Sequence, residues 1–501
     1  MKFERASGVL LHPSSLPGRY GIGDLGPSAF QFIDWLAGSG CKLWQILPLG
    51  PTGYGDSPYQ CFSAFAGNPY LISPDFLLRD DLLHPDDLVE IPDFEADKVD
   101  YGRLIPWKLN LLERAFIRFK SAPRTVHREY ERFCAENVSW LPDYALFMAI
   151  KEANGGGAWD GWPEALRKRD ADSLTEAGRR HVEAIERFTF YQFVFFRQWN
   201  AVREYAHQRG LQIIGDIPIF VAYDSADVWA NPELFYLDED GLPTVVAGVP
   251  PDYFSRTGQL WGNPLYRWDV LKAREYDWWI ARFRAALRQV DIVRLDHFRG
   301  FAGYWEIPAG SVTAETGRWA TGPGEEFLSA IELALGDAST GLSTGLPIIA
   351  EDLGEITPDV IELRDQFELP GMKILQFAFS DPENVFLPHN YPSHCVTYTG
   401  THDNDTARGW YESAPEHERD FARRYLDTDG SNFAWELTRA AWSSVAVYAI
   451  APIQDLLGLG TEARMNFPST LGGNWSWRLE ANQLTDELRG RLGELNYLYH
   501  R

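Results

Sequence analysis

Cysteine is scarce in this sequence, and its placement excludes several kinds of site. The chain has only four cysteines in 501 residues: Cys41, Cys61, Cys134 and Cys395. They show neither CxxC nor metal-ligand spacing, so neither a zinc site nor a disulfide scaffold is indicated. We expect free thiols in a reducing compartment, which favours a cytoplasmic protein.

Long apolar runs and an excess of basic residues are also missing. No uninterrupted apolar stretch approaches the roughly 20 residues that a membrane span needs, and residues 1–13 do not resemble a signal peptide. Basic residues number 46 against 71 acidic ones, so the net charge is −25. Because this charge repels polyanions at long range, we expect no nucleic acid and no membrane partner.

Aromatic residues, in contrast, are plentiful. They make up 14% of the chain, including 19 Trp and 22 Tyr. Aromatic rings fill protein cores, and they also stack on the apolar C–H face of a sugar while the sugar hydroxyls bind polar groups. Composition alone leaves both uses open.

Short apolar, β-branched runs recur along the chain, with amphipathic segments between them. They span residues 8–13, 42–49, 211–219, 290–296, 346–352, 372–377, 395–403 and 445–455. Continuous apolar runs are typical of parallel strands buried on both faces. Eight of them alternating with helices predict an α/β fold, a closed (β/α)8 TIM barrel. The competing open doubly wound sheet would need a phosphate-binding glycine loop directly after the first run, which we do not find there.

The spacing of these runs is uneven, which predicts insertions. We expect a single catalytic barrel domain over residues 1–501 with large helical insertions on the C-terminal face of the barrel. Residues 50–210 would form the insertion between strands 2 and 3. Residues 220–290 would form the one between strands 3 and 4, carrying a cleft loop at 250–266. Little sequence follows the last predicted helix, so we expect no C-terminal β-domain.

Charged residues follow the ends of several predicted strands, where catalytic side chains of barrels are found. They are Asp216, Arg294, Asp296, Glu351, Asp352, His402 and Asp403. A single such Asp is usually a helix cap, whereas several carboxylates on one rim suit either a hard cation or the cleavage of a glycosidic bond. Arg294 lies two residues before Asp296, on the same strand face, and would keep that Asp ionised. An ionised Asp opposed by a Glu of raised pKa favours glycoside chemistry.

Two loops mix aromatic with polar residues. Residues 50–60 (GPTGYGDSPYQ) and 250–266 (PPDYFSRTGQLWGNPLY) combine rings with amide, hydroxyl and carboxylate groups. Such a surface suits sugar binding, although long loops also pack on their own aromatic residues. The rim carboxylates favour the sugar interpretation.

Six motifs carry a resemblance to a known family. They are WQILPLGPTGYGDSPYQ, IGDIPIFVAYDSADVW, VRLDHFRGF, IIAEDLG, THDNDT and RMNFP, in this order. Together they resemble the 4-α-glucanotransferases of amylomaltase type, glycoside hydrolase family 77 of the α-amylase clan, from about residue 7 to residue 477. The resemblance implies transfer of α-1,4-glucan segments to the 4-hydroxyl of an acceptor, with maltooligosaccharides and α-1,4-glucans as partners.

The same resemblance implies roles for individual residues. Asp296 would be the nucleophile, Glu351 the general acid/base and Asp403 the carboxylate that stabilises the transition state. The residues implied to bind substrate are Ser57, Tyr59, Asp216, Tyr253, Trp261, Arg294, Asp381, His402 and Asn466. Tyr54 and Tyr101 match aromatic residues of a secondary glucan-binding groove.

One departure from the wider clan bears on metals. α-Amylases follow the third-strand Asp with an Asn–His pair that serves calcium, whereas Asp216 is followed by IPIFV. We therefore expect no metal and no other cofactor. Two alternatives stay open at this point, a retaining α-amylase-type hydrolase and a non-catalytic glycan-binding protein. Water and a sugar hydroxyl would attack the same intermediate, so the carboxylates alone do not choose between hydrolysis and transfer.

Overall fold

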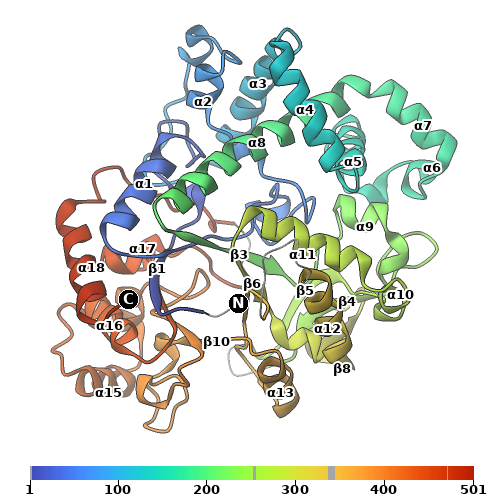
Figure 1. The fold of residues 1–501 in the computed structure, drawn as a ribbon. Helices are drawn as coiled ribbons and strands as arrows, with labels where there is room; N and C mark the ends of the chain where they lie inside the picture. The colour runs from blue at the N-terminus through green and yellow to red at the C-terminus, as the bar shows by residue number, and fades with distance from the viewer. Residues whose placement is uncertain (1–2, 252–254, 337–344, 471) are drawn as a thin grey trace.

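The computed structural model describes residues 3–251, 255–336, 345–470 and 472–501. Eight parallel strands close into a barrel in the order β1-β12-β11-β10-β9-β6-β3-β2 (Figure 1). They are β1 (Ala6–Leu10), β2 (Leu43–Gln45), β3 (Gln212–Pro218), β6 (Ile292–Asp296), β9 (Ile348–Ala350), β10 (Gly371–Ile374), β11 (Cys395–Tyr398) and β12 (Tyr448–Pro452). All eight predicted runs overlap their strands. The predicted barrel is confirmed.

Helices surround this barrel and cover its strands. They include α1 (Pro27–Gly38), α8 (Val182–Gln208), α11 (Asp277–Gln289), α12 (Gly324–Leu335), α13 (Pro358–Gln366), α16 (Phe433–Ser443) and α18 (Asp486–Leu498). Helix α1 begins with Pro27 at its first position, where the missing N–H costs no hydrogen bond. Helix α8 ends shortly before Gly210, whose φ of 75° stops the helix. Both boundaries follow from local sequence signals.

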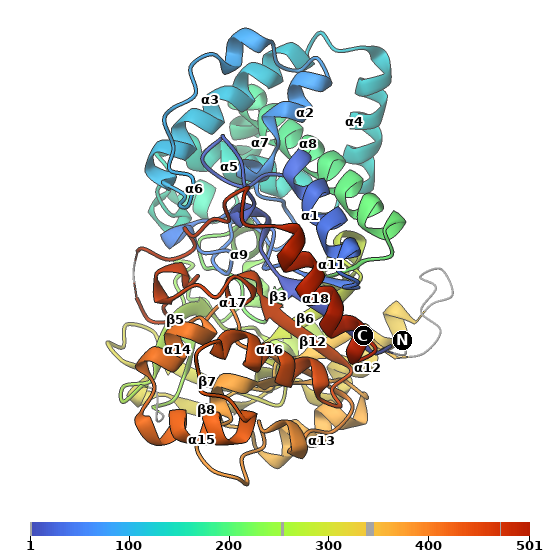
Figure 2. The ribbon, with the colours of Figure 1, turned by 90° about the vertical axis from the view of Figure 1, so that its left-hand side faces the viewer.

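The long connection between β2 and β3 is helical. It contains α2 (Pro74–Arg79), α3 (Tyr101–Phe119), α4 (Arg124–Glu136), α5 (Leu141–Ala153), α6 (Glu164–Arg167), α7 (Ala171–Arg180) and the start of α8. Figure 2 shows these helices gathered as a lobe at one end of the molecule. Aromatic rings pack its interior, among them Phe119 on Phe190 with ring centroids 4.7 Å apart. The apolar core of this lobe joins that of the barrel in one cluster.

A second sheet accompanies the predicted helical insertions and was not predicted. Four antiparallel strands pair in the order β5-β4-β7-β8. They are β4 (Val245–Val249), β5 (Gln259–Pro264), β7 (Gly303–Pro308) and β8 (Arg318–Thr321), and α9 (Ala226–Ala230) and α10 (Trp268–Ala273) flank the first pair in sequence. These strands are short, and three of the four contain Gly or Pro. They also pair segments on either side of β6, so no local pattern indicated them. Strand β5 lies within the predicted cleft loop 250–266.

The remaining helices are α14 (Ala407–Ser413), α15 (Glu416–Leu426) and α17 (Ile453–Leu456). Among the described residues after β12, helices and turns occur but no further sheet strand, in agreement with the absence of a C-terminal β-domain. The four cysteines are free thiols, as expected. In the described ranges, no helix has both the length and the apolar character needed to cross a bilayer.

Candidate active site

The strand register brings the predicted acids to one rim. Asp216 on β3 pairs with Arg294 on β6. Leu295 on β6 pairs with Ala350 on β9, so the residues that follow them, Asp296 and Glu351, come next to each other at the strand ends. His402 and Asp403 follow β11 on the same rim.

Arg294 links two of the carboxylates. Its Nη1 atom lies 2.7 Å from Oδ2 of Asp216 and 2.8 Å from Oδ1 of Asp296. Burial acts against the charge of Arg294, but the two carboxylates raise its pKa well above the ordinary value. Burial raises the pKa of Asp216 to about 6, although the guanidinium opposes this shift. The site therefore holds a permanent positive charge beneath Asp296.

Glu351 is the carboxyl group that the site keeps protonated. It is buried, and its oxygens accept hydrogen bonds from the main-chain nitrogens of His297 (2.6 Å) and Leu353 (3.0 Å). Burial raises the pKa of Glu351 to about 8, with a further contribution from the negative charge of Asp296; Arg294 and the two N–H groups act in the opposite direction. At neutral pH this side chain is a proton donor.

Asp403 is held in the opposite state. Its Oδ1 accepts a 2.6 Å hydrogen bond from Nδ2 of Asn466, and its Oδ2 lies 3.3 Å from Nε2 of His402. Burial would raise the pKa of Asp403. The charge of His402 and the hydrogen bonds from His402 and Asn466 outweigh that effect and lower the pKa below its usual range. Three acids on one rim thus have three different environments.

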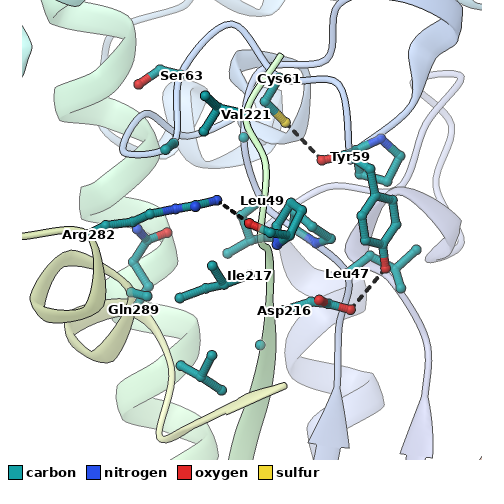
Figure 3. A pocket seen from close by; sticks show the side chains of 18 of the residues that line it. Leu47, Leu49, Tyr59, Cys61, Ser63, Asp216, Ile217, Val221, Arg282 and Gln289 are labelled. Carbon is teal, nitrogen blue, oxygen red and sulfur yellow. Dashed lines mark hydrogen bonds between the residues drawn. The ribbon is translucent and has the colours of Figure 1, made fainter. Parts of the chain in front are cut away.

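Tyr59 connects the loop 50–60 to this rim. Its hydroxyl donates to Oδ2 of Asp216 at 2.9 Å, a contact that Figure 3 shows. Its ring stacks on the imidazole of His402, with centroids 5.1 Å apart and planes 20° apart. The loop is closed by an antiparallel bridge between Thr52 and Cys61. Ser57 accepts a hydrogen bond from the Tyr59 nitrogen, so in this structure it shapes the turn that carries Tyr59.

A cavity lies beneath Tyr59 and Asp216, between this loop, β3 and α11 (Figure 3). Arg282 of α11 reaches from the far side and donates to the carbonyl oxygens of Pro218 (2.7 Å) and Ile219 (3.2 Å). These bonds fix the last residue of β3 and the residue that follows it. The end of the strand that carries Asp216 is therefore supported from behind.

Trp261 lies on β5 and reaches the catalytic rim. Its ring meets His297, the residue after Asp296, edge to face, with centroids 4.9 Å apart. Its Nε1 donates to Gln259 on the same strand. Tyr253, which was predicted on the cleft loop 250–266, lies outside the described residues.

The other predicted residues are placed differently. The Tyr101 hydroxyl donates to the main-chain oxygen of Trp475 at 3.0 Å. Asp381 is exposed, and its recorded hydrogen bonds join it to Ser380 and Glu383 of its own loop rather than to the catalytic rim. Tyr54 opens the short turn Tyr54–Asp56, and its side chain lies outside what the structure describes.

Two residues that the sequence did not single out also belong to the rim. His297 has left-handed backbone angles, φ 51° and ψ 50°, which direct its N–H to Glu351; burial lowers its pKa to about 4. Trp475 also has a positive φ of 60°. Its ring lies 5.7 Å from that of Tyr59 and 5.9 Å from that of His402. His297 stands within the motif VRLDHFRGF, whereas Trp475 gives no local signal beyond the glycines that precede it.

No metal-binding arrangement of three or more His, Cys, Asp or Glu side chains occurs within the described part of the chain. At the rim, the positive charge next to Asp216 and Asp296 comes from Arg294. What the arrangement offers chemically is a carboxylate paired with a guanidinium, a neutral carboxylic acid and a second, strongly ionised carboxylate. That combination matches the needs of a retaining glycosidase-type reaction.

Comparisons with known proteins agree with this chemistry. The model of glycoside hydrolase family 77, described as 4-alpha-glucanotransferase, matches residues 11–485. A 4-alpha-glucanotransferase of Thermus thermophilus is 53% identical over 98% of both chains, and one of Synechocystis is 52% identical over 99% of this chain and 98% of its own.

A solved structure supports the same assignment. The amylomaltase from Streptococcus agalactiae in complex with acarbose is 40% identical, covers 99% of this chain and all of its own, and superposes with a TM-score of 0.95. These likenesses favour the transferase over the hydrolase and the non-catalytic binding protein. The chain belongs to glycoside hydrolase family 77 and is a 4-alpha-glucanotransferase, an enzyme that acts on α-glucans.

Proposed function

We propose that the rim transfers glucan segments by double displacement through Asp296. Glu351 donates its proton to the bridging oxygen of the donor glucan while a carboxylate oxygen of Asp296 attacks the anomeric carbon. The C–O bond to the leaving chain breaks, and a covalent β-glucosyl ester with Asp296 forms. The leaving chain departs with the proton of Glu351.

The second step reverses these roles. Glu351, now ionised, takes the proton from the 4-hydroxyl of an acceptor glucan, and that oxygen displaces Asp296 from the anomeric carbon. The two inversions restore the α-linkage. Retaining chemistry requires about 5–5.5 Å between the two carboxyl groups, and neighbouring positions at the ends of β6 and β9 support that spacing.

Asp403 and His402 would bind the sugar as its ring flattens toward an oxocarbenium ion. The negative charge of Asp403 suits the positive charge that develops on the ring. Its lowered pKa keeps it ionised across the working range. Tyr59, Asp216 and Arg294 position the rim around them.

The single observation that carries this assignment is the split between the acids. Glu351 has a pKa raised to about 8, while Asp403 has a lowered one and Asp296 contacts a guanidinium. A general acid must hold its proton at the working pH while the other carboxylates stay ionised. The environments of these carboxyl groups support both conditions on one rim.

We further propose maltooligosaccharides as donors and acceptors, in the cytoplasm. Trp261 at His297 would shield the covalent intermediate from water and so favour transfer. Tyr101 and Tyr54 would belong to a secondary glucan groove, and Asp381 would contact glucan from its exposed loop. Free thiols at all four cysteines support a reducing compartment.

Incubation with maltotriose tests the reaction. We expect glucose and a ladder of longer oligosaccharides, with the total number of reducing ends nearly constant. The Asp296→Asn variant should lose both while its thermal unfolding stays unchanged. Acarbose, which a similar amylomaltase binds, should compete with maltotriose. Products that are only shorter than maltotriose would contradict transfer, and an active Asp296→Asn variant would contradict the nucleophile.

A further inference from the structure

A second cavity lies away from the catalytic carboxylates, where the insertion lobe meets the barrel. It has a volume of about 190 Å³ and is lined by residues of α5, α9 and α11 and by the chain after the loop 50–60. We call it the α5/α11 pocket and define it by Phe65, Trp140, Asp143, Asn231, Asp277 and Trp278. Helix α5 contacts α9, and residues of α5, α9 and α11 together line the pocket; the three helices are labelled in Figure 1.

Aromatic rings form one part of this wall. Phe65 and Trp140 are nearly parallel, with centroids 6.2 Å apart and planes 14° apart. Trp278 stands perpendicular to Phe65 at 5.9 Å. Phe65 and Trp278 are buried, whereas Trp140 is half-buried. Such rings offer faces and edges to the apolar C–H groups of a pyranose.

Polar groups form the rest of the wall, and several keep hydrogen-bonding capacity. Trp278 is only 6% exposed. Its indole N–H is buried and has no hydrogen-bond partner. Oδ1 of Asp143 accepts a 2.6 Å hydrogen bond from Arg169, which leaves Oδ2 able to accept a hydrogen bond from a ligand. Asn231 uses Nδ2 for the Asp227 carbonyl oxygen at 3.0 Å, which leaves its own carbonyl oxygen to accept.

Two of the three carboxyl groups that line the pocket are paired with an arginine. Asp143 pairs with Arg169, and Asp277 pairs with Arg274 at 2.9 Å. Burial raises the pKa of Asp227 to about 6, although the hydrogen bond that its carboxylate accepts from the Ala64 N–H acts to lower the pKa. A pocket with paired charges, aromatic faces and spare hydrogen-bonding atoms favours a neutral polyhydroxyl ligand over an ion.

The size and polarity of the pocket fit such a ligand. One water molecule needs only about 10–15 Å³ of this kind of volume, so a cavity of about 190 Å³ has room for a sugar ring. A buried donor without a partner has a free-energy cost that a ligand hydroxyl removes. Both features are independent of the catalytic rim.

A thin segment of chain separates this pocket from the active site. Ser63 lines both the α5/α11 pocket and the cavity beneath Tyr59 (Figure 3). The Ala64 nitrogen donates to Oδ2 of Asp227 at 2.7 Å and holds the segment against α9. The two sites are therefore distinct but share one short stretch that continues from Tyr59.

We propose that the α5/α11 pocket is a non-catalytic binding site for one glucose unit. The unit comes either from free glucose or from the end of a maltooligosaccharide. This inference rests on the proposed function only in that these sugars are the substrates and products of the enzyme. The pocket binds its ligand whether or not the rim residues have the roles given above.

Calorimetric titration of the full-length Asp296→Asn protein with maltotetraose and with glucose tests the proposal. We expect two classes of maltotetraose site. Adding Trp140→Ala should weaken one class by about tenfold or more and leave the other unchanged. Adding Asn231→Ala instead, which keeps the ring of Trp140, should weaken the same class. Tyr497→Ala serves as control, because this side chain is 82% exposed on α18.

The two sugar sources and the two proposals give separate outcomes. If glucose binds to the Trp140-dependent class of sites, free glucose is a ligand of the pocket. If only maltotetraose binds to that class, the ligand is the end of a maltooligosaccharide. Tyr59→Ala should weaken only the other class. If Tyr59→Ala leaves that class unchanged while the Trp140-dependent class is still present, the result counts against the rim assignment alone. Isotherms that are identical with and without Trp140→Ala and Asn231→Ala, in variants with unchanged thermal unfolding, overturn the pocket.

Discussion

The main-chain nitrogen of His297 lies 2.6 Å from a carboxylate oxygen of Glu351. The residue directly after Asp296 is thus hydrogen-bonded to the side chain that we propose as the proton donor. The left-handed backbone of His297 makes this contact possible, a conformation that costs free energy in a residue other than glycine. The peptide unit that follows Asp296 therefore holds the proposed nucleophile and the proposed acid in a fixed relative position.

Glu351 should set the alkaline limit of activity. Its pKa is raised to about 8, and above that pH it loses the proton that the leaving oxygen needs. We expect kcat/KM for maltotriose to fall about tenfold per pH unit above pH 8. A pH profile that stays flat to pH 10 would contradict this role.

The same shift predicts a trend in stability. A carboxyl group whose pKa is raised in the folded state holds a proton that the unfolded chain has lost, so folding is penalised progressively as pH rises from about 4.5 to about 8. Glu351→Gln removes this penalty. The melting temperature of the variant relative to the parent protein should therefore increase from pH 4 to pH 9, measured by calorimetry. Glu355→Gln, at an exposed position, should show no such trend.

Asn466 should control the ionisation of Asp403. Its side chain donates a 2.6 Å hydrogen bond to Oδ1 of Asp403. Asn466→Ala removes the donor, and Asn466→Asp adds a negative charge at the same place, so both raise the pKa of Asp403. We expect kcat to fall by about 10- to 100-fold and the acidic limb of the pH profile to move to higher pH, more for Asn466→Asp. A loss of activity without movement of the acidic limb would indicate a purely structural role.

Tyr59 should contribute through both its hydroxyl and its ring. Tyr59→Phe removes the 2.9 Å hydrogen bond to Asp216, and a bond to a charged group contributes about 1.5–3 kcal/mol. We expect kcat/KM to fall about tenfold or more. Tyr59→Ala also removes the ring stacked on His402 and should reduce kcat/KM further. Equal activity of the two variants would show that the ring adds nothing.

Trp261 should influence the choice between transfer and hydrolysis. Its ring covers His297, so its removal should admit water to the intermediate. With maltotriose, Trp261→Ala should produce an increase in total reducing ends that the parent protein does not, and Trp261→Phe should lie between them. The opposite result, fewer oligosaccharides with no new reducing ends, would assign Trp261 to substrate binding alone.

Sequence by itself predicted the eight barrel strands, the helices between them and the acids at the strand ends. These features are local, because apolar runs, caps such as Pro27 and stop signals such as Gly210 act over a few residues. The family motifs implied the individual roles that we propose for Asp296, Glu351 and Asp403.

Only the tertiary structure determined the rest. The sheet β5-β4-β7-β8 pairs segments that lie on either side of β6, and the ring of Trp475 reaches Tyr59 from more than 400 residues away in sequence. The extent to which the pKa of Glu351 is raised is likewise not encoded in any motif. It depends on the exclusion of water by the whole rim and on the negative charge of Asp296 next to it. Pairing over long distances and desolvation are properties of the packed chain, and no local pattern of residues carries them.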